Sequence, residues 1–122
     1  KGHDFVWRRK SRGMKDDVLY LKDIRDQCAD IIEETANITY EEFSNRRIYQ
    51  NGIILSIIII GEAAKQLSEE FKETHPEIPI SLLAKTRDKL VHGYRGIDIR
   101  TVWQIAVTDV PELYKSVTEI LK

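Results

Sequence analysis

Four chemically active side chains fall within one short segment of the chain, RDKLVHGY. They are a cation, a carboxylate, an imidazole and a phenol, contributed by Arg87, Asp88, His92 and Tyr94. On a continuous helix Asp88 and His92 share a face, so that Asp88 could orient His92 or raise its basicity. Arg87 and His92 are about 140° apart around such a helix. They could flank one ligand only if the helix loosens near Gly93, or if two copies meet across a symmetric interface.

An arginine and a histidine without a nucleophilic thiol or a set of metal ligands suit the cleavage of RNA, in which the ribose 2′-hydroxyl is the nucleophile. Histidine ordinarily titrates near neutral pH, so His92 could take or give a proton. Arg87 could hold the phosphate and stabilise the charge on its oxygens. The spacing alone also fits a structural role, with Arg87 paired to an acid and His92 packed.

The charge of the chain is unevenly distributed. The whole sequence has a net charge of −1, while residues 1–13 contain five basic residues and one acid, so the rest is acidic. An acidic body is a poor general binder of nucleic acid, and RNA contact must come from a local patch. Such a patch lies at residues 85–100, where Lys85, Arg87, Lys89, Arg95 and Arg100 stand against Asp88 and Asp98.

The first helix that must support this segment is expected to begin near Asp16 or Asp17, either of which can cap it. Apolar residues then recur at steps of three and four, which is typical of one buried helix face. They are Leu21, Ile24, Cys28 and Ile31. Cys28 on this face is interpreted as a core residue rather than as a nucleophile.

The second helix is predicted from the capping-box pattern of Thr39 and Glu42, and is expected to continue to about Phe71. Only Gly52 and Gly61 interrupt it, and these glycines are expected to serve close packing or a kink. The apolar run IILSIIII within it is far shorter than the roughly 20 residues that cross a bilayer. It is interpreted as buried helix, and no membrane association is expected.

The third helix is expected from Pro79 to about Gly93, and the fourth is expected to be capped by Asp98. Pro111 lies inside the fourth and predicts a kink or split at residues 109–110. The fold class is therefore all-α, an up-and-down bundle of four main helices.

The chain is long enough for one domain. Residues 1–13 are interpreted as a basic extension outside the domain, and residues 14–122 as a single helical domain; the rival reading of 1–13 is an arm that contacts a polyanion. Cys28 is the single cysteine, which excludes an internal disulfide and a zinc site of several thiolates. A free thiol is typical of the reducing cytoplasm.

At Arg87, His92 and Tyr94 the sequence resembles the HepT-like toxins of the HEPN (higher eukaryote and prokaryote nucleotide-binding) superfamily, which carry Arg, four residues, His, one residue and Tyr. Further segments resemble this group in the same order. They are Ile60-Gly61-Glu62-Ala63, the run from His75 to Pro79, and Asp98 with Trp103. The likeness covers nearly all of residues 14–122. One departure is Asp88, where the group often has Asn; an anionic Asp88 would also repel a phosphate.

The resemblance implies a homodimeric helical domain in which two motif copies face a shared cleft. Arg87 and His92 would be the catalytic pair of a metal-independent endoribonuclease without a cofactor, with Asp88 in support, and products would end in a 2′,3′-cyclic phosphate. The protein would be the toxin of a type VII toxin–antitoxin pair. An MntA-like nucleotidyltransferase antitoxin would neutralise it by AMPylation of Tyr94, which adds bulk and negative charge to an RNA-binding cleft.

Two other hypotheses stay open. In one, the protein is a non-catalytic helical dimer that binds a nucleotide or the partner transferase. In the other, it is a purely structural dimer, in which replacing Arg87 lowers stability without a biochemical phenotype. The local basic patch favours the first two hypotheses over the third.

Overall fold

The computed structural model describes residues 14–122, apart from the side chains of Met14, Lys15 and Tyr94. The predicted basic extension, residues 1–13, lies outside the described residues. Helices and turns make up the described part, which has no strand, and the all-α class is confirmed. The helices are α2 (Met14–Ala36), α3 (Tyr40–Asn45), α4 (Arg47–Lys65), α5 (Glu69–Thr74), α6 (Ile80–His92), α7 (Ile99–Gln104) and α8 (Val110–Ile120).

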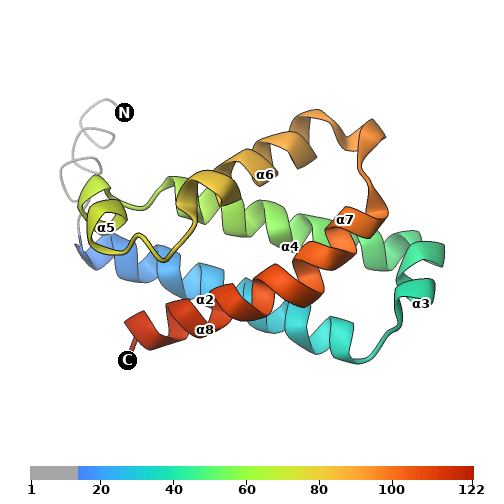
Figure 1. The fold of residues 1–122 in the computed structure, drawn as a ribbon, viewed down its shortest axis with the longest axis horizontal. Helices are drawn as coiled ribbons and strands as arrows, with labels where there is room; N and C mark the ends of the chain where they lie inside the picture. Colours follow the sequence, from blue (N-terminus) through green and yellow to red (C-terminus); the bar gives the residue numbers. More distant parts are fainter. Residues whose placement is uncertain (1–13) are drawn as a thin grey trace, which may run out of the picture.

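Helix α4 is the centre of the arrangement. It packs against α2 on one side and α6 on the other, and α2 also packs against α8 (Figure 1). The apolar stripe predicted for the first helix is buried in this core, and burial raises the pKa of the Cys28 thiol to about 12. Cys28 is therefore a core residue, as predicted. The largest fully buried side chains are Ile24, Ile31, Phe43, Ile60, Val102 and Val117.

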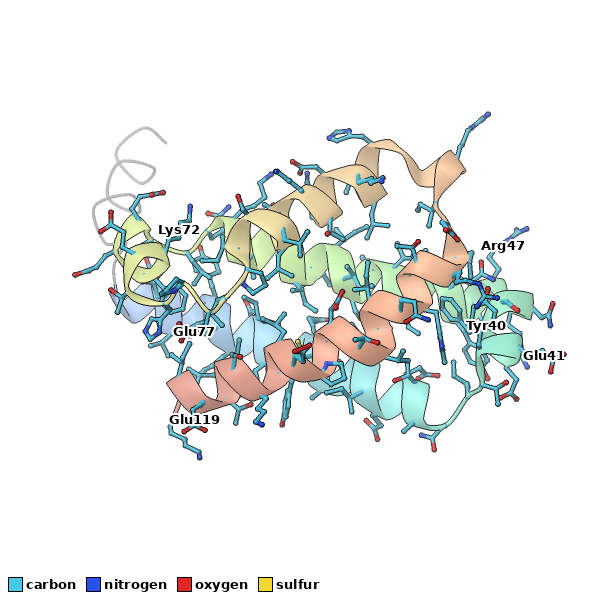
Figure 2. The ribbon with its side chains drawn as sticks, in the orientation of Figure 1. Tyr40, Glu41, Arg47, Lys72, Glu77 and Glu119 are labelled. Atoms are coloured by element: carbon cyan, nitrogen blue, oxygen red, sulfur yellow. The ribbon has the colours of Figure 1, made fainter. Side chains whose placement is uncertain are left out.

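An aromatic cluster closes one end of the core. The Tyr40 ring lies 5.9 Å from that of Trp103, and the Trp103 ring lies 5.2 Å from that of Phe43. The Arg100 guanidinium lies over the outer face of Tyr40, 4.5 Å from the ring centroid. Figure 2 shows Tyr40 where α3 meets α7. These rings therefore hold the N-terminal end of α4 against the C-terminal helices.

The first helix begins earlier than predicted, at Met14. Asp17 therefore does not cap it and is instead buried, with 6% of its surface exposed. Its carboxylate accepts hydrogen bonds from the Ser68 amide (2.8 Å) and the Ser68 hydroxyl (2.6 Å). Because Ser68 is the N-cap of α5, Asp17 ties the first turn of α2 to the segment that leads into α6.

The prediction of one helix from Thr39 to Phe71 was wrong, although its capping box is confirmed. Glu42 accepts from the Thr39 amide (2.9 Å), and Thr39 accepts from the Glu42 amide (3.1 Å). The helix ends at Arg46, whose backbone is extended, and the side-chain amide of Gln50 donates to the carbonyls of Phe43 and Ser44. A second break follows α4, where the Ser68 hydroxyl caps α5 by accepting from the Phe71 amide.

The remaining boundaries follow the sequence closely. Helix α6 begins after Pro79 and ends at Gly93, and Asp98 caps α7 by accepting from the Arg100 amide (3.0 Å). The predicted split before Pro111 is not a break in the chain. A π turn at Ile105–Asp109 joins α7 to α8, with the Val110 amide bonded to the carbonyl of residue 105, five residues earlier. The wider turn leaves room for the proline ring, which would clash with a carbonyl of an α-helix.

Helix α4 is also long and apolar enough to cross a bilayer by length and composition, and 33% of its apolar window is buried. The core helix of a soluble protein has the same properties, and α4 packs against both α2 and α6. The absence of a membrane-spanning segment therefore stays a prediction.

Candidate functional site

The backbones of α4 and α6 approach closely at Gly61. A Cβ at this position would lie 2.7 Å from the Leu83 carbonyl oxygen and closer still to the Arg87 Cβ, so only glycine fits. Glycine inside a helix costs about 1 kcal/mol relative to alanine. Gly61 therefore lowers the intrinsic stability of helix α4, but it allows close contact with the part of α6 that carries Arg87.

Arg87 is held between two carboxylates. Its Nη2 donates to Glu62 Oε2 (2.7 Å) and its Nη1 to Asp88 Oδ1 (3.0 Å), and its side chain is 20% exposed. Lys65 Nζ, from α4, also donates to Asp88 Oδ1 (3.3 Å). The third guanidinium nitrogen, Nε, is buried and has no hydrogen-bond partner in the described structure.

These contacts fix the charges of the cluster. The hydrogen bond from Arg87 and then that from Lys65 hold the pKa of Asp88 below its usual value. The same bond to Asp88 raises the pKa of Arg87 further above its ordinary value. Both groups are thus charged at neutral pH, and the two cations and two anions, Glu62 included, balance one another.

His92 is the last residue of α6 and is exposed. Among residues 14–122, no hydrogen bond or ion pair joins it to Arg87 or Asp88, and the Asp88 carboxylate instead accepts from Arg87 and Lys65 at Oδ1. The Gly93 amide donates to the Lys89 carbonyl (2.9 Å), which closes the helix directly after His92. The structure thus joins Arg87 to Asp88 by a hydrogen bond, whereas His92, at the helix end, has no such bond to either residue.

Tyr94 follows in a 3-10 turn, Tyr94–Gly96, and its side chain lies outside what the structure describes. The cations of the predicted patch other than Arg87 are exposed. Lys85 and Lys89 lie on α6, Arg95 lies within the turn itself, and Arg100 lies in the first turn of α7.

Glu62 and Lys65 belong to the candidate site but were not predicted from the sequence. They follow the apolar run of α4, and Gly61-Glu62-Ala63 belongs to the segments that resemble the toxin group. The available signal was that these two charged residues lie one and four positions after Gly61, a glycine within an apolar helix. Their partners on α6 could not be predicted without knowing how the two helices pack.

A groove of about 680 Å³ lies on another side of α6, between that helix and the α7–α8 segment. Apolar residues such as Leu82, Leu90 and Leu113 form most of its wall, and Lys85 and Lys89 also line it. Within residues 14–122, no cluster of three or more histidine, cysteine or acidic side chains is arranged to hold a metal ion.

Comparison with known proteins identifies close similarity over nearly the whole chain. The model of the family described as "Ribonuclease HepT-like" matches residues 24–120. "Putative RNase MJ1216" of Methanocaldococcus jannaschii is 39% identical over 108 residues, 88% of this chain and 89% of the relative. "Probable ribonuclease HepT" of Thermococcus cleftensis is 42% identical over 94 residues, 77% of this chain and 86% of the relative. "Putative RNase TTE0752" of Caldanaerobacter subterraneus is 38% identical over 109 residues, 89% of this chain and 97% of the relative. No solved structure matches.

Proposed function

The chain belongs to the HepT-like ribonuclease family, and from this premise we propose that it is the toxin of a type VII toxin–antitoxin pair, a metal-independent endoribonuclease. The observation that carries the proposal is the family match over residues 24–120, which includes the whole motif of Arg87, His92 and Tyr94. The position of Arg87, fixed where α4 and α6 meet, supports it.

In this reaction RNA supplies its own nucleophile. His92, exposed at the end of α6, takes the proton of the ribose 2′-hydroxyl or gives one to the leaving 5′-oxygen. Arg87 binds the phosphate and stabilises the negative charge that builds on its oxygens. The products end in a 2′,3′-cyclic phosphate and a 5′-hydroxyl.

In the proposed fold, α2, α4, α6 and α7–α8 form an up-and-down bundle. Because Arg87 and His92 point in different directions around α6, we favour an active site to which two copies of this bundle contribute. A row of apolar side chains on α4 supports the homodimer. Ile48 and Leu55 are 69% and 57% exposed, Ile59 is partly exposed, and their spacing of seven and four residues places them on one helix face. The next position of this row is Glu62, so a partner covering it would lie beside the Arg87 cluster.

The dimer has a direct test in Leu55→Glu, which adds a charge to this row and leaves the buried core unchanged. We expect light scattering to show monomers and RNA cleavage to be lost together. A dimer that persists, or binding of the row to lipid vesicles in place of a second copy, would contradict this part of the proposal.

Control of the toxin is proposed to act at Tyr94. A partner nucleotidyltransferase of the antitoxin would transfer AMP to its hydroxyl, two residues after His92. The added phosphate would place negative charge among the cations that attract RNA. The pair would act in the cytoplasm, where the free thiol of Cys28 is stable and RNA is available.

The groove beside α6 favours a second candidate function, a non-catalytic module that binds a nucleotide. Its apolar wall could cover a base, while Lys85 and Lys89, which also line it, could contact phosphate. This alternative predicts saturable nucleotide binding by a dimer that leaves RNA intact.

The deciding experiment is incubation of purified protein with total RNA in EDTA. We expect wild type to cleave RNA and His92→Ala and Arg87→Ala to lose cleavage. His75→Ala and Arg25→Ala are matched controls, because His75 pairs with Glu77 and Arg25 pairs with its neighbour Asp26. Intact RNA after incubation with folded, dimeric wild type, shown by mass spectrometry to be unmodified at Tyr94, would refute the enzyme.

A further inference from the structure

Glu62 is the one carboxylate described on α4 that contacts the Arg87 guanidinium. It accepts from Nη2 at 2.7 Å, whereas Asp88, on the same helix as Arg87, accepts from Nη1 at 3.0 Å. Figure 1 shows α4 and α6 side by side, so this bond joins two separate elements across the site. The two carboxylates bind different nitrogens, and together they hold the guanidinium plane in one orientation.

Stability does not explain this arrangement. The Glu62 side chain is 45% exposed, and ion pairs of that exposure contribute little to folding. The close approach at Gly61 weakens α4, and the buried Nε of Arg87 is left without an acceptor. Features that disfavour folding and hold one side chain in one orientation are typical of functional sites.

We propose that Glu62 is a positioning residue for RNA cleavage, an inference that rests on the proposed function. Glu62 keeps Nη2 of Arg87 in place, while Nη1 exchanges Asp88 for a phosphate oxygen of the RNA. Asp88 is the partner that gives way, because Lys65 also binds its carboxylate and continues to hold it when Arg87 turns to the substrate. An arginine already fixed at one nitrogen loses less orientational freedom when it binds phosphate at the other.

Two other roles for Glu62 predict different results. If its charge only repels RNA, removing the charge will tighten binding and speed cleavage. If it only stabilises the α4–α6 contact, its loss will lower the melting temperature, and the activity of the remaining folded protein will be unchanged.

The test compares Glu62→Gln, Glu62→Asp and the control Glu69→Gln, with kcat and KM measured on a short RNA in EDTA. Glu69 is 84% exposed and pairs with Lys72 on α5, so its substitution removes the same charge away from the site. We expect Glu62→Gln to lower kcat about 10- to 100-fold, as for a misplaced catalytic group, with KM changed by less than about threefold. Glu62→Asp, which keeps the charge but shortens the reach, should fall between Glu62→Gln and wild type, and Glu69→Gln should match wild type.

A second readout follows the guanidinium itself. In ¹⁵N-labelled protein, rotation about the Arg87 Cζ–Nη bonds should be slow in wild type and faster in Glu62→Gln. Wild-type cleavage combined with an unchanged kcat in Glu62→Gln would overturn this inference alone. Absence of cleavage by wild type would overturn the proposed function and this inference together. If Glu62→Gln melts below the assay temperature, a wild-type kcat in Glu62→Asp overturns the inference and a reduced one supports it.

Discussion

Replacing Gly61 with alanine tests whether close contact between α4 and α6 positions Arg87. The added Cβ would lie 2.7 Å from the Leu83 carbonyl oxygen, below the 3.0 Å that real Cβ contacts keep, and closer still to the Arg87 Cβ. Both neighbouring atoms belong to the fixed part of α6, so no flexible side chain can move aside. Helix α6 must therefore shift away from α4 as a unit.

The magnitude follows from two opposing effects. Overpacking of this kind costs about 1–3 kcal/mol, and the rigid neighbours favour the upper end. Alanine recovers about 1 kcal/mol of helix propensity. The net loss is about 2 kcal/mol, which lowers the melting temperature of a domain of this size by about 6–10 °C. Cleavage should fall about 100-fold even well below melting, because Arg87 moves with α6.

Gly52→Ala is the matched control. Gly52 lies in the same helix on its exposed side, and a Cβ there would meet nothing within 4 Å. It should gain about 1 kcal/mol from helix propensity, and it controls for stability alone, because Gly52 shares its helix face with Ile48 and Leu55 of the proposed dimer contact. Circular dichroism melts at two protein concentrations separate stability from association. If Gly61→Ala is at least as stable as wild type and cleaves RNA as fast, the steric reasoning about the α4–α6 contact is refuted.

Three further results are expected. Asp17→Ala removes two hydrogen bonds to a buried carboxylate and should cost about 2–4 kcal/mol in urea unfolding, and a loss below 1 kcal/mol would contradict the role given to Ser68. Cys28, buried with a pKa of about 12, should resist iodoacetamide at pH 8 in native protein and react quickly in guanidinium; rapid native labelling would show that the core opens easily. Hydrogen bonds from the Thr101 hydroxyl and the Arg100 amide lower the pKa of Asp98 in the folded protein. The charged carboxylate therefore stabilises the fold fully at pH values above its ordinary pKa of 3.8. This stabilisation is lost as the pH falls through the lower pKa of the folded protein. Asp98→Asn should therefore be less stable than wild type near neutral pH, and the difference should shrink below about pH 3.8; a constant difference would assign the effect to shape rather than charge.

Local signals made several helix boundaries predictable. The Thr39 capping box, the Asp98 cap and the end of α6 at Gly93 each depend on side chains a few residues from the backbone groups they satisfy. The break at Arg46 has no such signal, because neither glycine nor proline is near. It depends on Gln50, whose side-chain amide donates to the carbonyls of Phe43 and Ser44, and nothing in the sequence around a glutamine reveals such a contact.

The candidate site divides in the same way. Its residues on α6, Arg87, Asp88 and His92, lie within one short segment, and the motif was enough to predict them as a site. The partners of Arg87 could not be identified, because Glu62 is 25 positions earlier and meets it only through the packing of α4 on α6. The sequence-based hypothesis that Asp88 orients His92 did not take account of Lys65. Lys65 comes from α4 and binds the Asp88 carboxylate.

The π turn before Pro111 has a consequence for the length of the chain. A π turn takes one more residue than an α turn, so Ile105–Asp109 contains a one-residue insertion that the helix absorbs without breaking. Deleting one residue there, with Pro111 changed to alanine, would restore a regular α-helix and leave the faces of α7 and α8 in the same register. A deletion inside α4 would instead rotate every later side chain of that helix by about 100°. The C-terminal segment should therefore tolerate the loss of one residue at the π turn. The same loss inside α4, the helix that carries Gly61, should disrupt the packing of that helix.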